Sequence, residues 1–206
     1  PYTTLFRSNF FTKETHWTDD LKNDILREWG GTILFNNFKY KARGTAILFH
    51  PTFDFQIHDN TCDRTGRTMQ TLIEHTDCKF NLINIYAPRT NTERRIYFHL
   101  ISTLLSPAEA NILGGDFNCI SDDKLDKLGR NPSARQTANQ ILQTITQQHH
   151  LTDIWRDRNC DTQKNLHGLV NIHTIIIYSH SHCQILHVFT ASPLCYCKRH
   201  FTILLL

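Results

Sequence analysis

The sequence predicts a layered α/β domain over residues 1–160, because short apolar runs typical of strands alternate there with amphipathic helical segments. The chain has 206 residues, of which 40% are hydrophobic and 20% charged, an ordinary globular composition with enough residues for one sizeable core. No apolar run approaches the roughly 20 residues that span a bilayer, so we expect no membrane contact. The net charge of +3 is compatible with a polyanionic partner without requiring one.

The first half of the chain is expected to hold one helix and several strands. The helix has an acidic cap at Asp19 or Asp20 and a stop at Gly30, and its hydrophobic residues recur at helical spacing: Leu21, Ile25, Leu26 and Trp29. Strand-like runs follow at residues 32–35, 45–49 and 53–57. Residues 79–86 form another run that is apolar on both faces, with Phe80 and Leu82 on one and Ile83 and Ile85 on the other. Such a strand is expected to lie between two layers.

The second half is expected to hold two capped helices around a short strand. Thr90 and Glu93 have the spacing of a capping box, and a helical apolar stripe follows them: Tyr97, Leu100, Ile101, Leu104 and Leu105. The short strand is predicted at residues 110–113. Ser133 and Gln136 form a second capping box before a helix whose inward residues are Ala134, Ala138, Ile141, Leu142 and Ile145.

The most informative stretch is Gly114-Gly115-Asp116-Phe117-Asn118, directly after that short strand. On an extended backbone Asp116 and Asn118 project from one face and Phe117 from the other. The two glycines let the chain turn and let another group approach closely. A carboxylate beside a carboxamide can orient a water for attack on phosphorus, although Asp-x-Asn is equally common as simple turn chemistry.

Two further sites have both a functional and a structural interpretation. Asn84 and Tyr86 share a face at the end of the doubly apolar strand, and Pro88 stops that strand. They could hydrogen-bond a phosphate oxygen, or they could be satisfied strand-end groups. Glu14 follows the apolar pair Phe10-Phe11 and could bind a hard cation such as Mg²⁺, whereas a lone Glu is more often a solvated surface acid.

Five motifs occur in one order along the chain: Glu14-Thr15-His16, residues 43–48 (Arg-Gly-Thr-Ala-Ile-Leu), residues 84–88 (Asn-Ile-Tyr-Ala-Pro), residues 113–118 (Leu-Gly-Gly-Asp-Phe-Asn) and residues 151–156 (Leu-Thr-Asp-Ile-Trp-Arg). In this order and spacing they resemble the endonuclease/exonuclease/phosphatase superfamily. More narrowly, the chain resembles the apurinic-endonuclease-like domain of LINE-type (non-LTR) retrotransposon polyproteins. The resemblance covers roughly residues 8–160.

The resemblance implies a four-layer α/β sandwich, in which two mainly antiparallel sheets are flanked by helices, and phosphodiester cleavage with Mg²⁺ or Mn²⁺. It assigns Glu14 to metal binding, Tyr86 to the phosphate, Asp116 to activation of the attacking water and Asn118 to its orientation, with Asn84 in a supporting role. The implied partner is DNA, the implied location is the nucleus, and no small-molecule cofactor is expected. We expect a monomer. The odd count of seven cysteines also indicates a reducing, intracellular compartment.

The sequence departs from the family's pattern at both ends, so we expect a sandwich that is incomplete there. Asn9 is too close to Glu14 to be the Asn of the family's first strand. The Arg-Ile-Asp-Tyr and Ser-Asp-His segments that the family has downstream do not occur. Residues 179–182 (Ser-His-Ser-His) lack the Asp that would hold a catalytic histidine.

Residues 161–206 differ in composition from the rest of the chain. No Asp or Glu follows Asp161, and the segment after it holds six of the 13 histidines. We interpret this tail as out-of-frame translation in a frameshifted or mis-spliced copy, poorly packed, with a strand expected only at Thr174–Tyr178. The hypothesis fails if the downstream DNA encodes neither missing segment in another reading frame.

Three functions remain open at this point. The first is a retroelement's nicking endonuclease domain, impaired by its missing segments. The second is a non-catalytic nucleic-acid-binding remnant of the same domain, since attraction to phosphate survives the loss of catalytic groups. The third is a metal-binding tail, which is disfavoured because its cysteines and histidines lack the paired spacing of zinc sites: His180, His182, Cys183, His187, Cys195, Cys197 and His200.

Overall fold

The computed structural model describes residues 9–13, 15, 19–38, 43–119, 137–153, 176–177 and 201–204. In chain order these residues form β1 (Asn9–Lys13), α1 (Asp19–Trp29), β2 (Ile33–Asn36), β3 (Thr45–Leu48), β4 (Gln56–Cys62), β5 (Thr68–His75), β6 (Cys78–Tyr86), α2 (Asn91–Leu104), β7 (Ala110–Asp116), α3 (Thr137–Gln148), β8 (Thr152–Asp153), β9 (Ile176–Ile177) and β10 (Phe201–Leu204).

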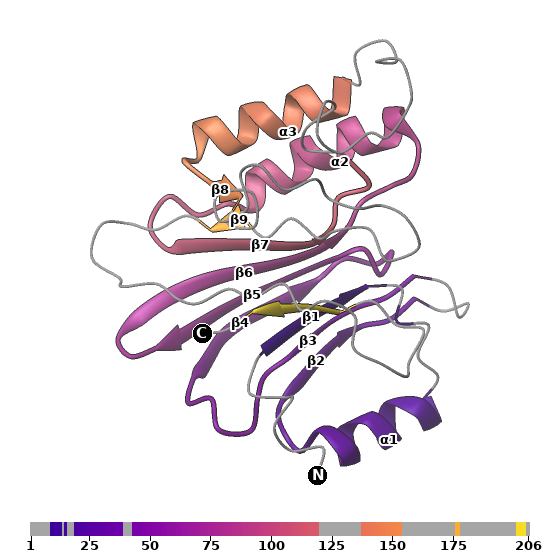
Figure 1. The fold of residues 1–206 in the computed structure, drawn as a ribbon, viewed down its shortest axis with the longest axis vertical. Helices are drawn as coiled ribbons and strands as arrows, with labels where there is room; N and C mark the ends of the chain where they lie inside the picture. The colour runs from indigo at the N-terminus through magenta and orange to yellow at the C-terminus, as the bar shows by residue number, and fades with distance from the viewer. Residues whose placement is uncertain are drawn as a thin grey trace, which may run out of the picture.

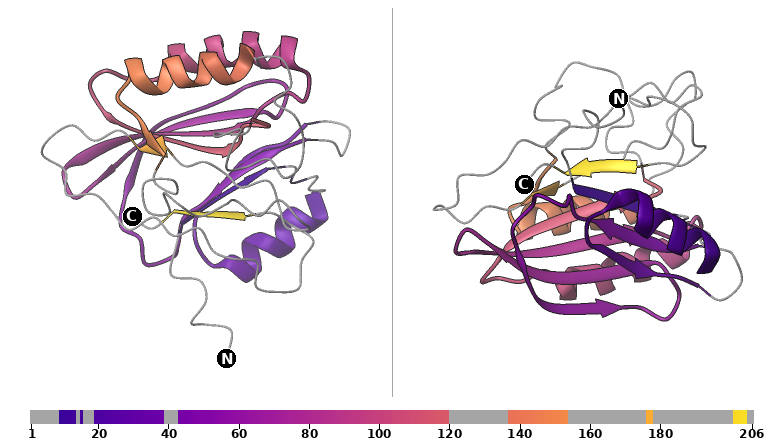
Figure 2. Two further views of the ribbon diagram at one scale, coloured as in Figure 1. Left: turned by 45° about the horizontal axis from the view of Figure 1, so that its top comes forward. Right: turned by 90° about the horizontal axis from the view of Figure 1, so that it is seen from below.

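The strands form two sheets that lie face to face, with helices on both outer sides (Figures 1 and 2). One sheet has the order β10-β1-β3-β2 and the other the order β4-β5-β6-β7-β9-β8. All neighbouring pairs are antiparallel except β6 and β7, which are parallel. Helix α1 covers the four-stranded sheet, and α2 and α3 cover the six-stranded one. The predicted four-layer sandwich is therefore confirmed.

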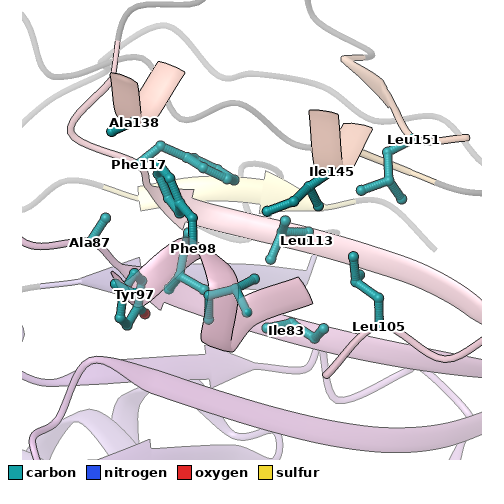
Figure 3. Close-up of a cluster of buried hydrophobic side chains, with 12 residues drawn as sticks. Ile83, Ala87, Tyr97, Phe98, Leu105, Leu113, Phe117, Ala138, Ile145 and Leu151 are labelled. Carbon is teal, nitrogen blue, oxygen red and sulfur yellow. The ribbon is translucent and has the colours of Figure 1, made fainter. Parts of the chain in front are cut away.

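Three hydrophobic clusters hold the four layers together, and β6 contributes to two of them. Phe80 and Leu82 point between the sheets, where they join Ile47 and Phe49 of the β3 segment. The alternate β6 residues point toward α2 and α3, as the two-faced pattern predicted, and Figure 3 shows this second cluster around Phe98. The third cluster joins α1 to the four-stranded sheet.

Helix α2 confirms the predicted N-cap at Thr90 but corrects the predicted apolar stripe. The Thr90 hydroxyl accepts a hydrogen bond from the Glu93 amide, as expected of an N-cap. Leu100, predicted to face inward, is 53% exposed, whereas Phe98 is fully buried. The buried face also includes Arg94, a polar residue that an apolar stripe cannot reveal.

The edge of the six-stranded sheet was not fully predicted. Strand β4 is exposed along its whole length, so it lacks the alternation of a half-buried strand, and it begins at Gln56 rather than at Phe53. Phe53 and Phe55 instead stack on Phe49. The sequence analysis did not identify strand β5, because Thr71 lies between the apolar residues of its buried face.

Two short strands of the tail are described. Ile176–Ile177 pairs with β7 and β8, within the predicted Thr174–Tyr178 strand, and Phe201–Leu204 pairs with β1. The second capping box and Trp155-Arg156 lie outside the described residues, and the out-of-frame origin of the tail stays a prediction.

Among the described cysteines, Cys62 and Cys119 are free thiols, whereas Cys78 is disulfide-bonded, which a reducing compartment does not favour.

Within the described part of the chain, no helix has the length and apolar character needed to cross a membrane.

Candidate active site

The candidate site lies where the parallel strands β6 and β7 end side by side. Their register places Tyr86 opposite Asp116, so the two functional candidates reach the same edge of the sheet. Gly115 makes this approach possible: its φ is +120°, and a Cβ there would overlap the carbonyl oxygen of Ile85 and lie 2.8 Å from Oδ1 of Asn84. The second glycine of the motif is therefore required by the backbone of the neighbouring strand.

Asp116 is a buried carboxylate inside a tight turn. Its side chain is only 3% exposed, and Oδ1 accepts a hydrogen bond from the backbone N–H of Asn118 at 2.9 Å. Asn118 has a φ of +48°, so its backbone is left-handed rather than extended, which corrects the expectation that these residues alternate along a strand. Phe117 does point the other way, into the cluster beneath α2. An Asx-type turn thus places the carboxylate and the carboxamide together.

The same turn is fastened to the end of β6 through Ala87. The Ala87 N–H donates to the Asp116 carbonyl at 2.7 Å, and Nδ2 of Asn118 donates to the Ala87 carbonyl at 2.7 Å. Since Nδ2 serves this structural bond, the carboxamide oxygen of Asn118 is the atom left for a ligand or a water.

Tyr86 is held by Arg67, a residue that the sequence analysis did not single out. The Tyr86 N–H donates to the Arg67 carbonyl at 2.7 Å, and Nη1 of Arg67 donates to the Tyr86 carbonyl at 2.8 Å. The guanidinium also lies over the Tyr86 ring, 5.0 Å from its centroid. The Tyr97 hydroxyl donates to the Arg67 carbonyl at 3.0 Å, and burial raises the pKa of this phenol, so it remains a neutral donor. Arg67 precedes the unrecognised strand β5, which is why it was missed.

Asp63 organises the turn that presents Arg67. Its Oδ1 accepts from the N–H groups of Arg67 and Thr68 at 2.8 and 2.9 Å and from Nδ2 of Asn36 at 2.9 Å, and its Oδ2 accepts from the Thr65 hydroxyl. Burial by itself would raise the pKa of Asp63, but these hydrogen bonds outweigh it and lower the pKa below its usual value. The ionised carboxylate is therefore the form that stabilises the fold.

This gives a prediction for stability against pH. Because the pKa of Asp63 is lower in the folded protein, its ionised carboxylate stabilises the fold at pH values above the unfolded pKa of 3.8. This stabilisation is lost as the pH falls through the lower pKa of the folded protein. We expect Asp63→Ala to cost about 1–3 kcal/mol at pH 7 and less at pH 2, because protonation below the unfolded pKa makes the carboxyl group a weaker acceptor for its partners. Urea unfolding of both proteins at the two pH values measures this. An equal cost at both pH values would contradict it.

Asn84 joins the two sheets rather than facing the opening of the site. It is fully buried, and its Nδ2 donates to the Ala46 carbonyl of β3 at 2.9 Å. Ala46 lies on β3, which pairs with β1. The bond therefore joins β6 to the four-stranded sheet, in which Lys13 of β1 directly precedes Glu14. The bond is structural, and the supporting role of Asn84 in the site stays a prediction.

Glu14 lies outside the described residues, but the residues on either side of it are placed. Lys13 pairs with Thr45, and the N–H of Thr15 donates to the Gly44 carbonyl at 3.3 Å. Strand β1 lies against β6 and β7 as well as beside β3. The strand that precedes Glu14 therefore lies against the two strands that bear Tyr86 and Asp116.

Arg94 connects the loops that follow β6 and β7. It is 6% exposed, and Nη1 donates to the carbonyls of Pro88 and Arg89 at 3.1 and 2.9 Å. Its guanidinium also interacts with Cys119, just beyond Asn118; burial raises the pKa of that thiol to about 11, and Arg94 partly opposes the rise. A buried arginine thus holds the loop after β6 and lies beside the residues that follow β7.

The donor set suits a hard cation but is incomplete within the described residues. Tyr86, Asp116 and Asn118 offer oxygen atoms, which Mg²⁺ and Mn²⁺ prefer. In the ranges that the structure describes, no group of three or more His, Cys, Asp or Glu side chains comes together. Mg²⁺ is usually held by one or two carboxylates with waters and phosphate, and Glu14 is the carboxylate that the sequence offers for it.

Comparison with known proteins finds a transposon-encoded relative for most of the chain. No protein-family description matches it. It is 32% identical over 156 residues to the transposon TX1 uncharacterized 149 kDa protein of Xenopus laevis, a match that covers 74% of this chain and 12% of that protein. The chain thus spans about an eighth of the length of this relative.

Solved structures share the fold at low sequence identity. An AP endonuclease from Archaeoglobus fulgidus matches with a TM-score of 0.60 and 13% identity, over 82% of this chain and 75% of that one. The AP endonuclease of Leishmania major gives 0.57 at 14% identity, over 75% and 61% of the two chains. The catalytic domain of Xenopus laevis APE2 gives 0.56 at 18% identity, over 73% and 63%. The chain is therefore similar to one part of a transposon-encoded protein, and it has the α/β-sandwich fold of AP endonucleases.

Proposed function

We propose that this chain is the endonuclease domain of a retroelement protein, that it nicks DNA by Mg²⁺-dependent phosphodiester hydrolysis, and that its rate is low. The observation that supports this most strongly is the buried carboxylate of Asp116, held by the turn at Asn118 and level with Tyr86. The comparisons support the same reaction, because AP endonucleases are among the solved structures that share the fold. Its substrate would be chromosomal DNA, so we place its action in the nucleus, as a monomer.

In this proposal the protein's own groups position a water and the phosphate. The Asp116 carboxylate accepts one proton of the water, and the carboxamide oxygen of Asn118 accepts the hydrogen bond of the other. The Tyr86 hydroxyl donates to a non-bridging phosphate oxygen. The water oxygen forms a bond to phosphorus, the bond from phosphorus to a sugar oxygen breaks, and that sugar oxygen takes a proton from solvent.

Mg²⁺, which Glu14 would hold, would neutralise charge on the phosphate and on the leaving oxygen. Mn²⁺ would serve the same purpose. The low rate follows from the sequence, which lacks the Ser-Asp-His and Arg-Ile-Asp-Tyr segments expected by resemblance. Losing members of a mutually dependent site costs several orders of magnitude in rate.

Relaxation of supercoiled plasmid by the purified chain in molar excess tests this function. We expect slow conversion to the nicked circle with Mg²⁺ or Mn²⁺ and none with EDTA. No conversion above a protein-free control, at any metal concentration, would contradict the proposal.

The second candidate is a nucleic-acid-binding remnant without catalysis, favoured by the same missing segments. It predicts salt-dependent DNA binding with no nicking under the conditions above. The two candidates therefore differ in one assay, since both predict binding and only the first predicts a nicked product.

A further inference from the structure

The buried face of α2 carries two polar side chains that reach the end of β6. Arg94 and Tyr97 are three residues apart, so they lie on the same side of the helix, and both are buried. Nη1 of Arg94 donates to the carbonyl of Pro88, two residues beyond Tyr86. The Tyr97 hydroxyl instead donates to the carbonyl of Arg67, in the turn before β5. Helix α2 therefore contacts both the loop that follows Tyr86 and the turn that is hydrogen-bonded to it.

The carbonyl of Arg67 links α2 directly to Tyr86. It accepts hydrogen bonds from the Tyr86 N–H at 2.7 Å and from the Tyr97 hydroxyl at 3.0 Å. A carbonyl oxygen has two lone pairs, so these two donors use its full capacity. The guanidinium of Arg67 also donates to the Tyr86 carbonyl at 2.8 Å and lies 5.0 Å from the centroid of the ring. The backbone and the ring of Tyr86 therefore both depend on where Arg67 lies.

A second hydroxyl fixes the direction of the Tyr97 hydroxyl. The Thr68 hydroxyl lies 2.7 Å from the Tyr97 oxygen, and both residues are buried. Since the single hydroxyl proton of Tyr97 goes to the Arg67 carbonyl, Thr68 is the donor in this pair. Burial raises the pKa of Tyr97, so the phenol keeps the proton that this arrangement needs. The hydrogen bonds thus run in one direction, from Thr68 through Tyr97 to the Arg67 carbonyl.

The ring of Tyr97 and its hydroxyl serve different purposes. The ring packs in the hydrophobic cluster beneath α2, together with Ala87 and Phe98 (Figure 3). A phenylalanine ring would fill the same space, so packing alone does not require a hydroxyl at this position. What the hydroxyl adds is a hydrogen bond to the turn that holds Tyr86.

We propose that Tyr97 is a positioning residue for the nicking reaction, whose hydroxyl holds Tyr86 in place through the Arg67 carbonyl. This rests on the proposed function, in which the Tyr86 hydroxyl donates to a phosphate oxygen. Tyr97 acts through the strand end, by keeping Tyr86 level with Asp116. A misplacement of about 1 Å can lower a rate by as much as about 100-fold, so loss of this restraint should slow cleavage. It should leave DNA binding unchanged.

Removal of the hydroxyl alone tests the proposal. Tyr97→Phe keeps the ring and its packing, and Thr68→Val removes the donor to Tyr97 while keeping the shape of its own side chain. Thr71→Val is the matched control, because it also removes one buried hydroxyl, which donates to a side chain of β4 at 2.8 Å. Thr71 pairs with Leu82, four residues before Tyr86 and therefore roughly 13 Å from it at the usual rise per strand residue.

We expect Tyr97→Phe to lower the single-turnover nicking rate about 10-fold, and to leave the DNA dissociation constant in EDTA within about 2-fold of wild type. Thr68→Val should slow nicking about 3-fold, and the double variant should be no slower than Tyr97→Phe, because both hydroxyls act through one chain of hydrogen bonds. Thr71→Val should nick like wild type. A Tyr97→Phe rate equal to that of Thr71→Val would overturn the proposal, and so would a double variant slowed by the product of the separate effects.

Hydrogen exchange of the Tyr86 amide, measured without DNA or metal, shows whether the restraint itself is lost. We expect Tyr97→Phe to speed exchange at Tyr86 about 10-fold relative to exchange at Leu82 in the same strand, and Thr71→Val to leave this ratio unchanged. A general loss of stability would speed both amides alike. An unchanged ratio in Tyr97→Phe would therefore overturn the proposal.

The rate and the exchange ratio distinguish the positioning role from the proposed function. If wild type nicks and Tyr97→Phe nicks equally fast, the positioning role fails and the function stands. If wild type does not nick, the proposed function fails, and the exchange ratio alone decides whether Tyr97 holds Tyr86 in place.

Discussion

Replacing Asp116 with Asn is expected to lower the nicking rate at least about 100-fold, to the level of a protein-free control. The change keeps the size of the side chain and the oxygen that accepts from the Asn118 N–H, so the turn should survive. It removes the carboxylate that takes the water's proton, and general-base catalysis typically contributes 10²- to 10⁴-fold. Single-turnover plasmid relaxation with protein in excess measures the loss.

The control for this variant is Asp77→Asn. Asp77 is exposed in the turn between β5 and β6, at the far end of the strand that bears Tyr86. Its φ is +62°, a conformation that Asn tolerates well. Asp77→Asn removes one negative charge, as Asp116→Asn does, and we expect its nicking rate to equal that of wild type. If Asp116→Asn nicked as fast as Asp77→Asn, Asp116 would not be the activating group.

Replacing Gly115 with Ala is expected to destabilise the fold by about 3 kcal/mol or more, among the larger effects of single substitutions. The added methyl group would overlap the Ile85 carbonyl, which belongs to the backbone of a central strand and cannot rotate away. The φ of +120° adds conformational strain for any residue with a Cβ. Urea unfolding monitored by circular dichroism measures the loss.

Gly30→Ala is the control that separates the two causes of the loss at Gly115: atomic overlap with β6 and backbone strain. Gly30 also has a positive φ, +73°, but nothing lies within 4 Å of where its Cβ would be. We therefore expect a cost of about 1–2 kcal/mol, from the left-handed backbone alone. Equal losses for the two variants would show that contact with β6 is not what requires Gly115.

The layers of the fold could be predicted where the sequence carries a simple period. The doubly apolar run of β6 identified a strand between two layers, and its faces divide as expected between the two clusters. The cap at Thr90 was equally clear, because it depends on residues three apart. Both features are local, so they are visible without the rest of the structure.

The unpredicted parts depend on partners distant in the chain. Strand β5 buries Thr71, whose hydroxyl donates to Oδ1 of Asn60 on β4, so burial there relies on a neighbouring strand rather than on apolar periodicity. Leu100 fits a helical apolar stripe but lies on the outer side of α2, a fact that only the packing of the layers decides.

The site was predicted in its motif residues and missed in their supports. Tyr86, Asp116 and Asn118 meet at one edge because β6 and β7 are parallel neighbours. The sequence could not reveal the Asx-type turn at Asn118 or the hydrogen bond from Arg67 to the Tyr86 carbonyl. Each depends on a hydrogen-bond partner that the sequence does not identify. The role of Glu14 in metal binding stays a prediction.

The central claim is that the edge formed by Tyr86, Asp116 and Asn118 hydrolyses a phosphodiester bond with water. Cleavage of a defined DNA duplex in ¹⁸O-labelled water with Mg²⁺, followed by mass spectrometry of the cut ends, tests it most directly. We predict one ¹⁸O atom in each new terminal phosphate, formed by wild type and not by Asp116→Asn. Cut ends without the label, or equal labelled product from both proteins, would contradict the account.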